Sequence, residues 1–158
     1  MRVLISNSLR KKIVYCSSEK FLDTITQILN NLSKIYDIKI RIMDSARFPY
    51  AGTINMNGEF IRISSDCLLN ISEMLSTIFH ELGHAFCIRN GKWYEYHVHK
   101  NKRAMLNTAY KAEIWVDEWA ETEMKKYFPK VKYNKLLDDF SPKEIKEYYR
   151  NFVLEAMR

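Results

Sequence analysis

Hydrophobic residues recur at helical spacing in three long stretches of the chain. The first stretch follows Ser17 and Ser18, either of which can act as its N-cap, and the second runs to about Arg89. The third covers about residues 104–128 and stops before Pro129. The apolar stripe of the first stretch consists of Phe21, Ile25, Ile28, Leu29, Leu32 and Ile35. Such a stripe predicts an amphipathic helix that covers a sheet.

A second pattern, strict alternation of apolar and polar residues, predicts strands. Asp37–Met43 alternates apolar with basic residues, as expected for a strand with one buried face. Thr53–Asn57 and Glu59–Ser64 flank the pair Asn57-Gly58, which is a strong signal for a hairpin. These segments predict a small, mostly antiparallel sheet. Two further short strands are expected at Arg2–Ile5 and Lys12–Cys16.

The Glu59–Ser64 strand leads directly into the second helical stretch, for which Ser65 or Asp66 is the expected N-cap and Asn90-Gly91 the expected stop. If this strand lies at the edge of the sheet, its free backbone groups can align an extended peptide. An edge covered by its own loop is the alternative. Near the C-terminus, the run 141–144 has the elements of a capping box and predicts a last helix.

Composition adds limits to this picture. The 158 residues are 47% hydrophobic and 28% charged, which predicts a single globular domain. Its core is expected at about residues 17–128, followed by a connector and a helix at 129–158. The sequence lacks the pattern of a signal peptide or a membrane span. Three cysteines, an odd number, are typical of reduced thiols in a cytoplasmic protein. The net charge of +6 is compatible with nucleic acid as a partner but favours a solvated basic surface.

The second helical stretch contains the pentad His80-Glu81-Leu82-Gly83-His84. Residues four apart lie on one face of a helix, so both imidazoles can bind one ion, for which Zn²⁺ is the natural candidate. Glu81 lies beside the open coordination position, where a general base for a zinc-bound water belongs. The apolar residues around the pentad predict a buried segment, which argues against a chance match.

A third protein ligand is expected from the third helical stretch, where Glu113 and Asp117 share a face. One can ligate zinc while the other accepts a hydrogen bond from the free ring N–H of a ligating histidine. H-E-L-G-H followed by E-x-x-x-D-x-W-A resembles the gluzincin peptidases, in particular the small ImmA/IrrE-type metallo-endopeptidases. The resemblance implies His80, His84 and Glu113 as ligands, Glu81 as the general base and Asp117 as the partner of a histidine.

The same resemblance implies a zincin-like α+β fold: an N-terminal helix, a small sheet, a metal-binding helix and a glutamate helix. Val116 and Trp115 depart from the usual second motif without changing the expected ligands. The sequence shows no counterpart of the helix-turn-helix domain of some members, which leaves the substrate open. The implied activity is zinc-dependent endopeptidase action on a specific intracellular protein or peptide.

Two other classes of zincin differ from this one in the third ligand. A metzincin requires glycine and histidine where this chain has Cys87 and Asn90, which excludes that class. An SprT-like zincin takes a later histidine, for which His99 has a similar spacing, although the residues that usually accompany it are missing. The alternative to an enzyme is a catalytically silent zincin-fold module bound to nucleic acid or a larger assembly. Candidates for contacts to substrate or oxyanion are Tyr94, Tyr96, His97, His99 and Tyr110.

Overall fold

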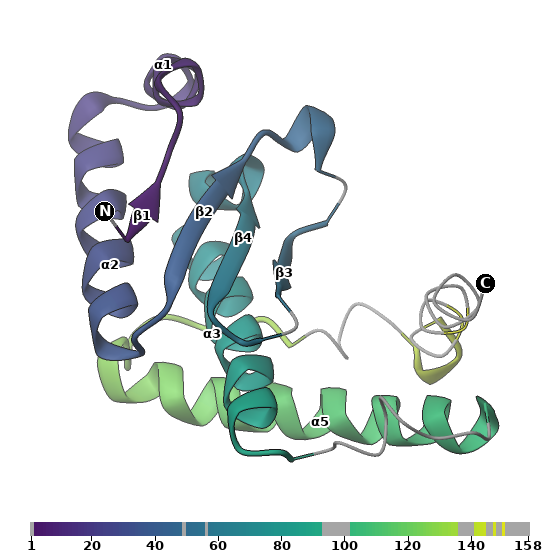
Figure 1. Ribbon diagram of the computed structural model, residues 1–158. Coiled ribbons are helices and arrows are strands. Elements are labelled where there is room, and N and C mark those ends of the chain that lie inside the picture. The colour runs from purple at the N-terminus through teal and green to yellow at the C-terminus, as the bar shows by residue number, and fades with distance from the viewer. Residues whose placement is uncertain are drawn as a thin grey trace.

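The computed structural model describes residues 2–48, 50–55, 57–92, 102–135, 141–144, 147 and 150. Its architecture is α+β, with one small sheet and helices packed on one of its faces (Figure 1). The main elements are β1 (Val3–Leu4), α1 (Asn7–Cys16), α2 (Glu19–Ile35), β2 (Lys39–Met43), β3 (Gly52–Ile54), β4 (Phe60–Ser64), α3 (Ile71–Arg89) and α5 (Lys102–Tyr127).

The sheet is mixed, with the strand order β1-β2-β4-β3. β1 pairs with β2 in parallel, β2 pairs with β4 in parallel, and β3 alone runs antiparallel to its neighbour β4. The expected mostly antiparallel sheet is therefore wrong. The reason is the connections: α2 carries the chain back to the starting end of the sheet, as parallel pairing requires, and β4 then enters between β2 and β3.

The predicted hairpin is confirmed at β3 and β4. Gly58 adopts φ +66°, in the left-handed region that glycine enters without steric cost, and its N–H donates to the Asn55 carbonyl at 2.9 Å. Asn55 Oδ1 accepts the N–H groups of Glu59 and Phe60 at 2.7 and 2.9 Å. Because β4 is paired on both sides, the Glu59–Ser64 segment is not an edge, and β3 is the outer strand here.

The register of the sheet separates a buried face from an open one. Ile40 lies beside Ile61, and Ile42 beside Ile63, and all four side chains are buried under the helices. The intervening residues of β2 and β4 point the other way. α2 and α3 cover the buried face (Figure 1), and the core combines the strand isoleucines with Leu22, Ile25, Leu29, Leu32, Met74, Leu75, Ile78, Phe79 and Leu82.

One predicted strand and one predicted helix start need correction, and two predicted helix boundaries are confirmed. Lys12–Cys16 is not a strand but the end of α1, where Leu9 and Ile13, four residues apart, are buried together. The N-cap of α3 is Asn70, whose Oδ1 accepts the Glu73 N–H at 3.1 Å, because residues 65–69 first form a 3-10 helix. The start of α2 after Ser18 and the end of α3 before Asn90-Gly91 agree with the prediction.

The C-terminal capping box is also confirmed, since Ser141 Oγ accepts the Glu144 N–H at 3.3 Å and Glu144 Oε2 accepts the Ser141 N–H at 2.8 Å. Most of the helix expected after it lies outside the described residues. Among the helices of the described ranges, none combines the length and the apolar character needed to cross a membrane.

Gly83 permits the close crossing of α3 and α5. A Cβ at this position would lie 2.9 Å from Val116 Cγ1 and 3.2 Å from Trp119 Cε3. The tight packing against α5 accounts for a glycine inside a helix, where it otherwise costs about 1 kcal/mol relative to alanine.

We expect Gly83→Ala to lower stability by about 1–3 kcal/mol through overpacking, although alanine is the better helix former. Thermal unfolding of the metal-free protein measures the effect. Adding Val116→Ala, which removes the nearest atom, is expected to recover part of the loss. A Gly83→Ala protein as stable as the wild type would contradict this account of the crossing.

Candidate metal centre

α3 brings two histidines to the side of the helix that faces α5. His80 and His84 are one turn apart, and their Nε2 atoms lie 3.2 Å from each other. Both side chains are largely buried, at 13% and 18% exposed. The predicted convergence of the two imidazoles is therefore present in the structure.

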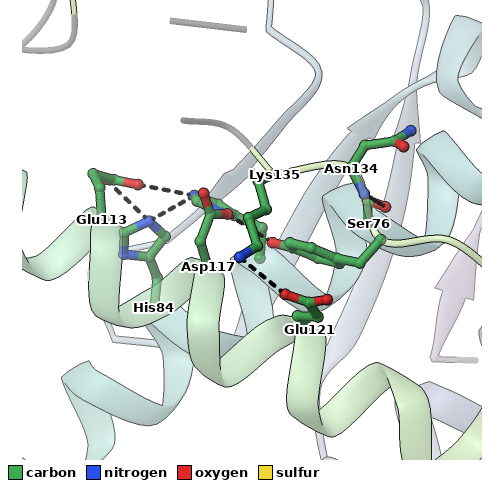
Figure 2. A network of polar contacts seen from close by, with 9 residues as sticks. Ser76, His84, Glu113, Asp117, Glu121, Asn134 and Lys135 are labelled. Atoms are coloured by element: carbon green, nitrogen blue, oxygen red, sulfur yellow. Dashed lines mark hydrogen bonds and ion pairs between the residues drawn. The ribbon is translucent and has the colours of Figure 1, made fainter. Parts of the chain in front are cut away.

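α5 places Glu113 opposite this pair. Glu113 Oε2 lies 3.0 Å from His80 Nε2, and Glu113 Oε1 lies 3.3 Å from His84 Nε2. Figure 2 shows Glu113 and His84 facing each other across the two helices. One donor atom from each of His80, His84 and Glu113 falls within 4.8 Å of the others, so the three residues are close enough together to hold a metal ion.

Asp117, one turn further along α5, lies behind His80. Its Oδ1 is 3.0 Å from His80 Nδ1 and is 2.8 Å from the Tyr133 hydroxyl, which donates to it. A carboxylate at Nδ1 favours a proton on that nitrogen and leaves Nε2 for an ion. Asp117 itself is only 1% exposed, so its hydrogen bonds stabilise a charge that burial would otherwise penalise.

No sequence pattern pointed to Tyr133 as part of this centre. It lies in the segment interpreted as a polar, basic connector, and the available signal was an aromatic residue within that polar run. The segment is bonded to both α3 and α5 (Figure 2). Asn134 N–H donates to Ser76 Oγ of α3 at 2.9 Å, and Lys135 Nζ lies 3.1 Å from Glu121 Oε2 of α5. Tyr133 is thereby held against Asp117.

We expect Tyr133→Phe to weaken metal binding about tenfold and to lower stability by about 1.5–3 kcal/mol, because a buried carboxylate loses a hydrogen bond. Competition with a chromophoric chelator and thermal unfolding measure the two effects. Tyr15→Phe is the matched control, since Tyr15 is 92% exposed. Equal metal affinity in the two variants would show that the tyrosine does not support the centre.

The side chain of Glu81, a residue of α3, lies against the outer strand β3. A Cβ at Gly52 would be 3.1 Å from Glu81 Cγ and 2.6 Å from Thr77 Cγ2, so glycine in β3 gives the strand room to approach the helix here. Burial raises the pKa of Glu81, against the opposing effect of His84 and His80. The result is a carboxyl group that takes up a proton more readily than an exposed glutamate.

The charges of the centre depend on one another. Burial alone would raise the pKa of Glu113, but His84 and His80 outweigh it and hold that pKa well below the usual range. For His80, burial disfavours the charged form, whereas Asp117 and Glu113 favour it more strongly and raise its pKa to about 10. Without a metal ion, a proton on His80 therefore supplies positive charge among buried carboxylates.

One further predicted residue, Tyr110, lies in the described part of the structure. Tyr110 lies on α5 three residues before Glu113 and is half-buried. Four other candidates fall outside the described residues: Tyr94, Tyr96, His97 and His99. The alternative of His99 as the third ligand therefore stays a prediction.

Comparisons of the chain with protein-family models, with curated proteins and with solved structures found no match. The class that the structure defines is thus an α+β protein with a possible metal-binding triad of two histidines and one glutamate. Any closer assignment depends on the two sequence motifs and on the geometry of the site.

Proposed function

We propose that this protein is a zinc-dependent endopeptidase of the gluzincin type, similar to the ImmA/IrrE-type enzymes. The observation that carries the proposal is the combination of a three-donor centre with a buried carboxylate, Glu81, between the metal helix and the outer strand. A purely structural zinc site normally has four protein ligands and has no use for such a residue.

The donor set fits Zn²⁺. In tetrahedral coordination with bonds of about 2.0–2.1 Å, neighbouring donor atoms are about 3.3–3.4 Å apart. His80 Nε2 lies 3.2 Å from His84 Nε2 and 3.0 Å from Glu113 Oε2, whereas His84 Nε2 lies 3.3 Å from the other carboxylate oxygen, Oε1. Each of these separations is close to the tetrahedral value, and one donor atom from each residue falls within 4.8 Å of the others. Two imidazole nitrogens and one carboxylate oxygen are the ligands of known catalytic zinc sites, which keep one position open.

When bound, zinc would polarise a scissile carbonyl and lower the pKa of a water molecule. Glu81 then accepts the proton of the attacking water on its carboxylate and passes it to the leaving amine, so one residue acts as base and later as acid. Its raised pKa brings it closer to the ideal for such a shuttle. Asp117 and Tyr133 orient His80 throughout.

β3 offers a way to align the substrate. Ser64 N–H donates to the Ala51 carbonyl and Asn55 N–H to the Phe60 carbonyl, so residues 51, 53 and 55 face β4. In an antiparallel pair the intervening backbone groups, those of Gly52 and Ile54, then point away from β4. An extended peptide paired with them would pass beside Glu81, which packs against Gly52.

The proposal is tested by incubating the zinc-loaded protein with a mixture of peptides and identifying new termini by mass spectrometry. We expect cleavage at internal bonds, its loss on treatment with a chelator and its return when zinc is added. Cleavage that persists without metal would contradict the mechanism. Stoichiometric zinc without any cleavage would favour the silent zincin-fold module.

Zinc affinity is expected to rise with pH. His80 has a pKa of about 10 in the metal-free protein, so near neutral pH it must release a proton before Nε2 can ligate. The association constant should therefore increase about tenfold per pH unit between about pH 7 and 8.5. Competition with a chromophoric chelator measures this slope.

Asp117→Asn provides the control for the pH dependence, because Asp117 is the largest influence that raises the His80 pKa. In this variant the His80 pKa should fall, so the slope should flatten at a lower pH than in the wild type. A wild-type affinity that does not change over the same range would contradict the assignment of the proton to His80.

A further inference from the structure

The face of the sheet opposite α2 and α3 carries a cluster of cations. Lys39 and Arg41 of β2 and Arg62 of β4 are exposed, and they alternate with the buried isoleucines. We call Lys39, Arg41, Phe60 and Arg62 the open sheet face. Figure 1 shows α3 behind the sheet, on the far side from the viewer.

The register brings these residues side by side. Arg41 is the direct neighbour of Arg62, and Lys39 is the direct neighbour of Phe60. Adjacent strands are about 4.8 Å apart, and alternate residues of one strand about 6.6 Å. Like charges directly opposite each other on neighbouring strands are destabilising. The neighbouring charges of Arg41 and Arg62 therefore repel each other, and an anion bound between the two guanidinium groups would offset this repulsion.

Acidic groups do not neutralise this cluster within the described ranges. Arg2 pairs with Asp37, and Lys12 pairs with Asp44. None of the ion pairs found among the described residues includes Lys39, Arg41 or Arg62. Their charge is therefore available to a partner.

The aromatic residue in the cluster indicates what kind of polyanion fits. The Arg62 guanidinium lies over the half-buried Phe60 ring, 5.0 Å from its centroid. A flat ring and guanidinium beside cations offer a base a surface for stacking and offer its phosphates charge partners. An acidic peptide would use the charges but not the flat stacking surface.

The width of the sheet indicates whether single-stranded or double-stranded nucleic acid fits this face. Four strands at about 4.8 Å span about 14 Å between the outer two, which exceeds the roughly 12 Å of a DNA major groove. A duplex cannot place its base edges against such a face, whereas a single strand can lie across it. We propose that the open sheet face binds single-stranded nucleic acid, independently of the metal centre.

The test measures fluorescence anisotropy of labelled single-stranded oligo(dT) and oligo(U) with the full chain over a range of salt. With three phosphate contacts, the slope of log K against log salt concentration should be about −2, since each contact on a single strand contributes about −0.7. Arg41→Ser combined with Arg62→Ser should weaken binding at least tenfold, and Phe60→Leu about fivefold or more.

Lys130→Ser with Lys132→Ser is the matched control. It removes the same charge from two exposed lysines that line the surface pocket near Tyr133, away from the sheet, and binding should stay within about twofold of wild type. Equal weakening in the control and sheet variants would overturn the proposal. So would an absence of binding at low salt, a duplex that binds as tightly, or polyglutamate that displaces the strand as well as an oligonucleotide does.

Ultraviolet crosslinking of the wild-type complex keeps the test decisive if the sheet variants do not fold. Crosslinks in peptides that contain Lys39–Met43 or Phe60–Ser64 are expected. Crosslinks confined to other parts of the chain would overturn the assignment to the open sheet face.

Discussion

Glu113→Ala is expected to remove zinc from the purified protein while leaving the fold of the sheet intact. Its carboxylate lies 3.0 and 3.3 Å from the two histidine Nε2 atoms and is only 2% exposed, so water cannot readily replace it. The loss of affinity should exceed the roughly 10- to 100-fold that follows loss of a carboxylate behind a ligating histidine. Elemental analysis and chelator competition measure it.

Glu118→Ala is the matched control for this variant, because Glu118 lies on the same helix but is exposed. It should bind zinc as the wild type does. If Glu113→Ala retains zinc and His99→Ala loses it, the third ligand is His99 and the site is of the SprT-like type.

The second large effect is expected for Glu81→Gln. Glutamine keeps the shape of the side chain but cannot take the proton of the attacking water, so turnover should fall about 10²- to 10⁴-fold. Zinc content should not change, since Glu81 is not a ligand in the proposed site. The metal-free variant should be at least as stable as the wild type, because burial disfavours the charge of Glu81.

Cleavage of the peptide mixture, zinc content and thermal unfolding are compared with those of Glu73→Gln, an exposed acid on the same helix. That control should keep its activity. Undiminished cleavage by Glu81→Gln would eliminate this residue as the general base.

The main parts of the candidate site could be predicted from the sequence because helical geometry is local. His80 and His84 four apart, and Glu113 and Asp117 four apart, each had to share a helix face once the two helices were recognised. That the two faces meet depends on the packing of α3 against α5. Gly83 lies at this contact, but a glycine inside a helical pattern does not by itself indicate which segment packs against it.

The features that were missed depend on contacts between distant segments. Tyr133 reaches Asp117 because residues 131–135 are fastened to Ser76 and Glu121, which no local pattern reveals. Strand direction was mispredicted because it depends on the route of the chain through α2 and β3, and alternation does not encode that route. At Lys12–Cys16, β-branched residues suggested a strand, whereas burial of Ile13 beside Leu9 favours a helix.

The division of the three donor residues between α3 and α5 has a mechanical consequence. An ion bound to His80, His84 and Glu113 joins two helices that are separated along the chain, and so acts as a removable crosslink between them. Its binding free energy adds to that of folding, by about 2.7 kcal/mol when free metal is at 100 times its dissociation constant. The rigidity of the helix crossing would then vary with the metal supply around the protein.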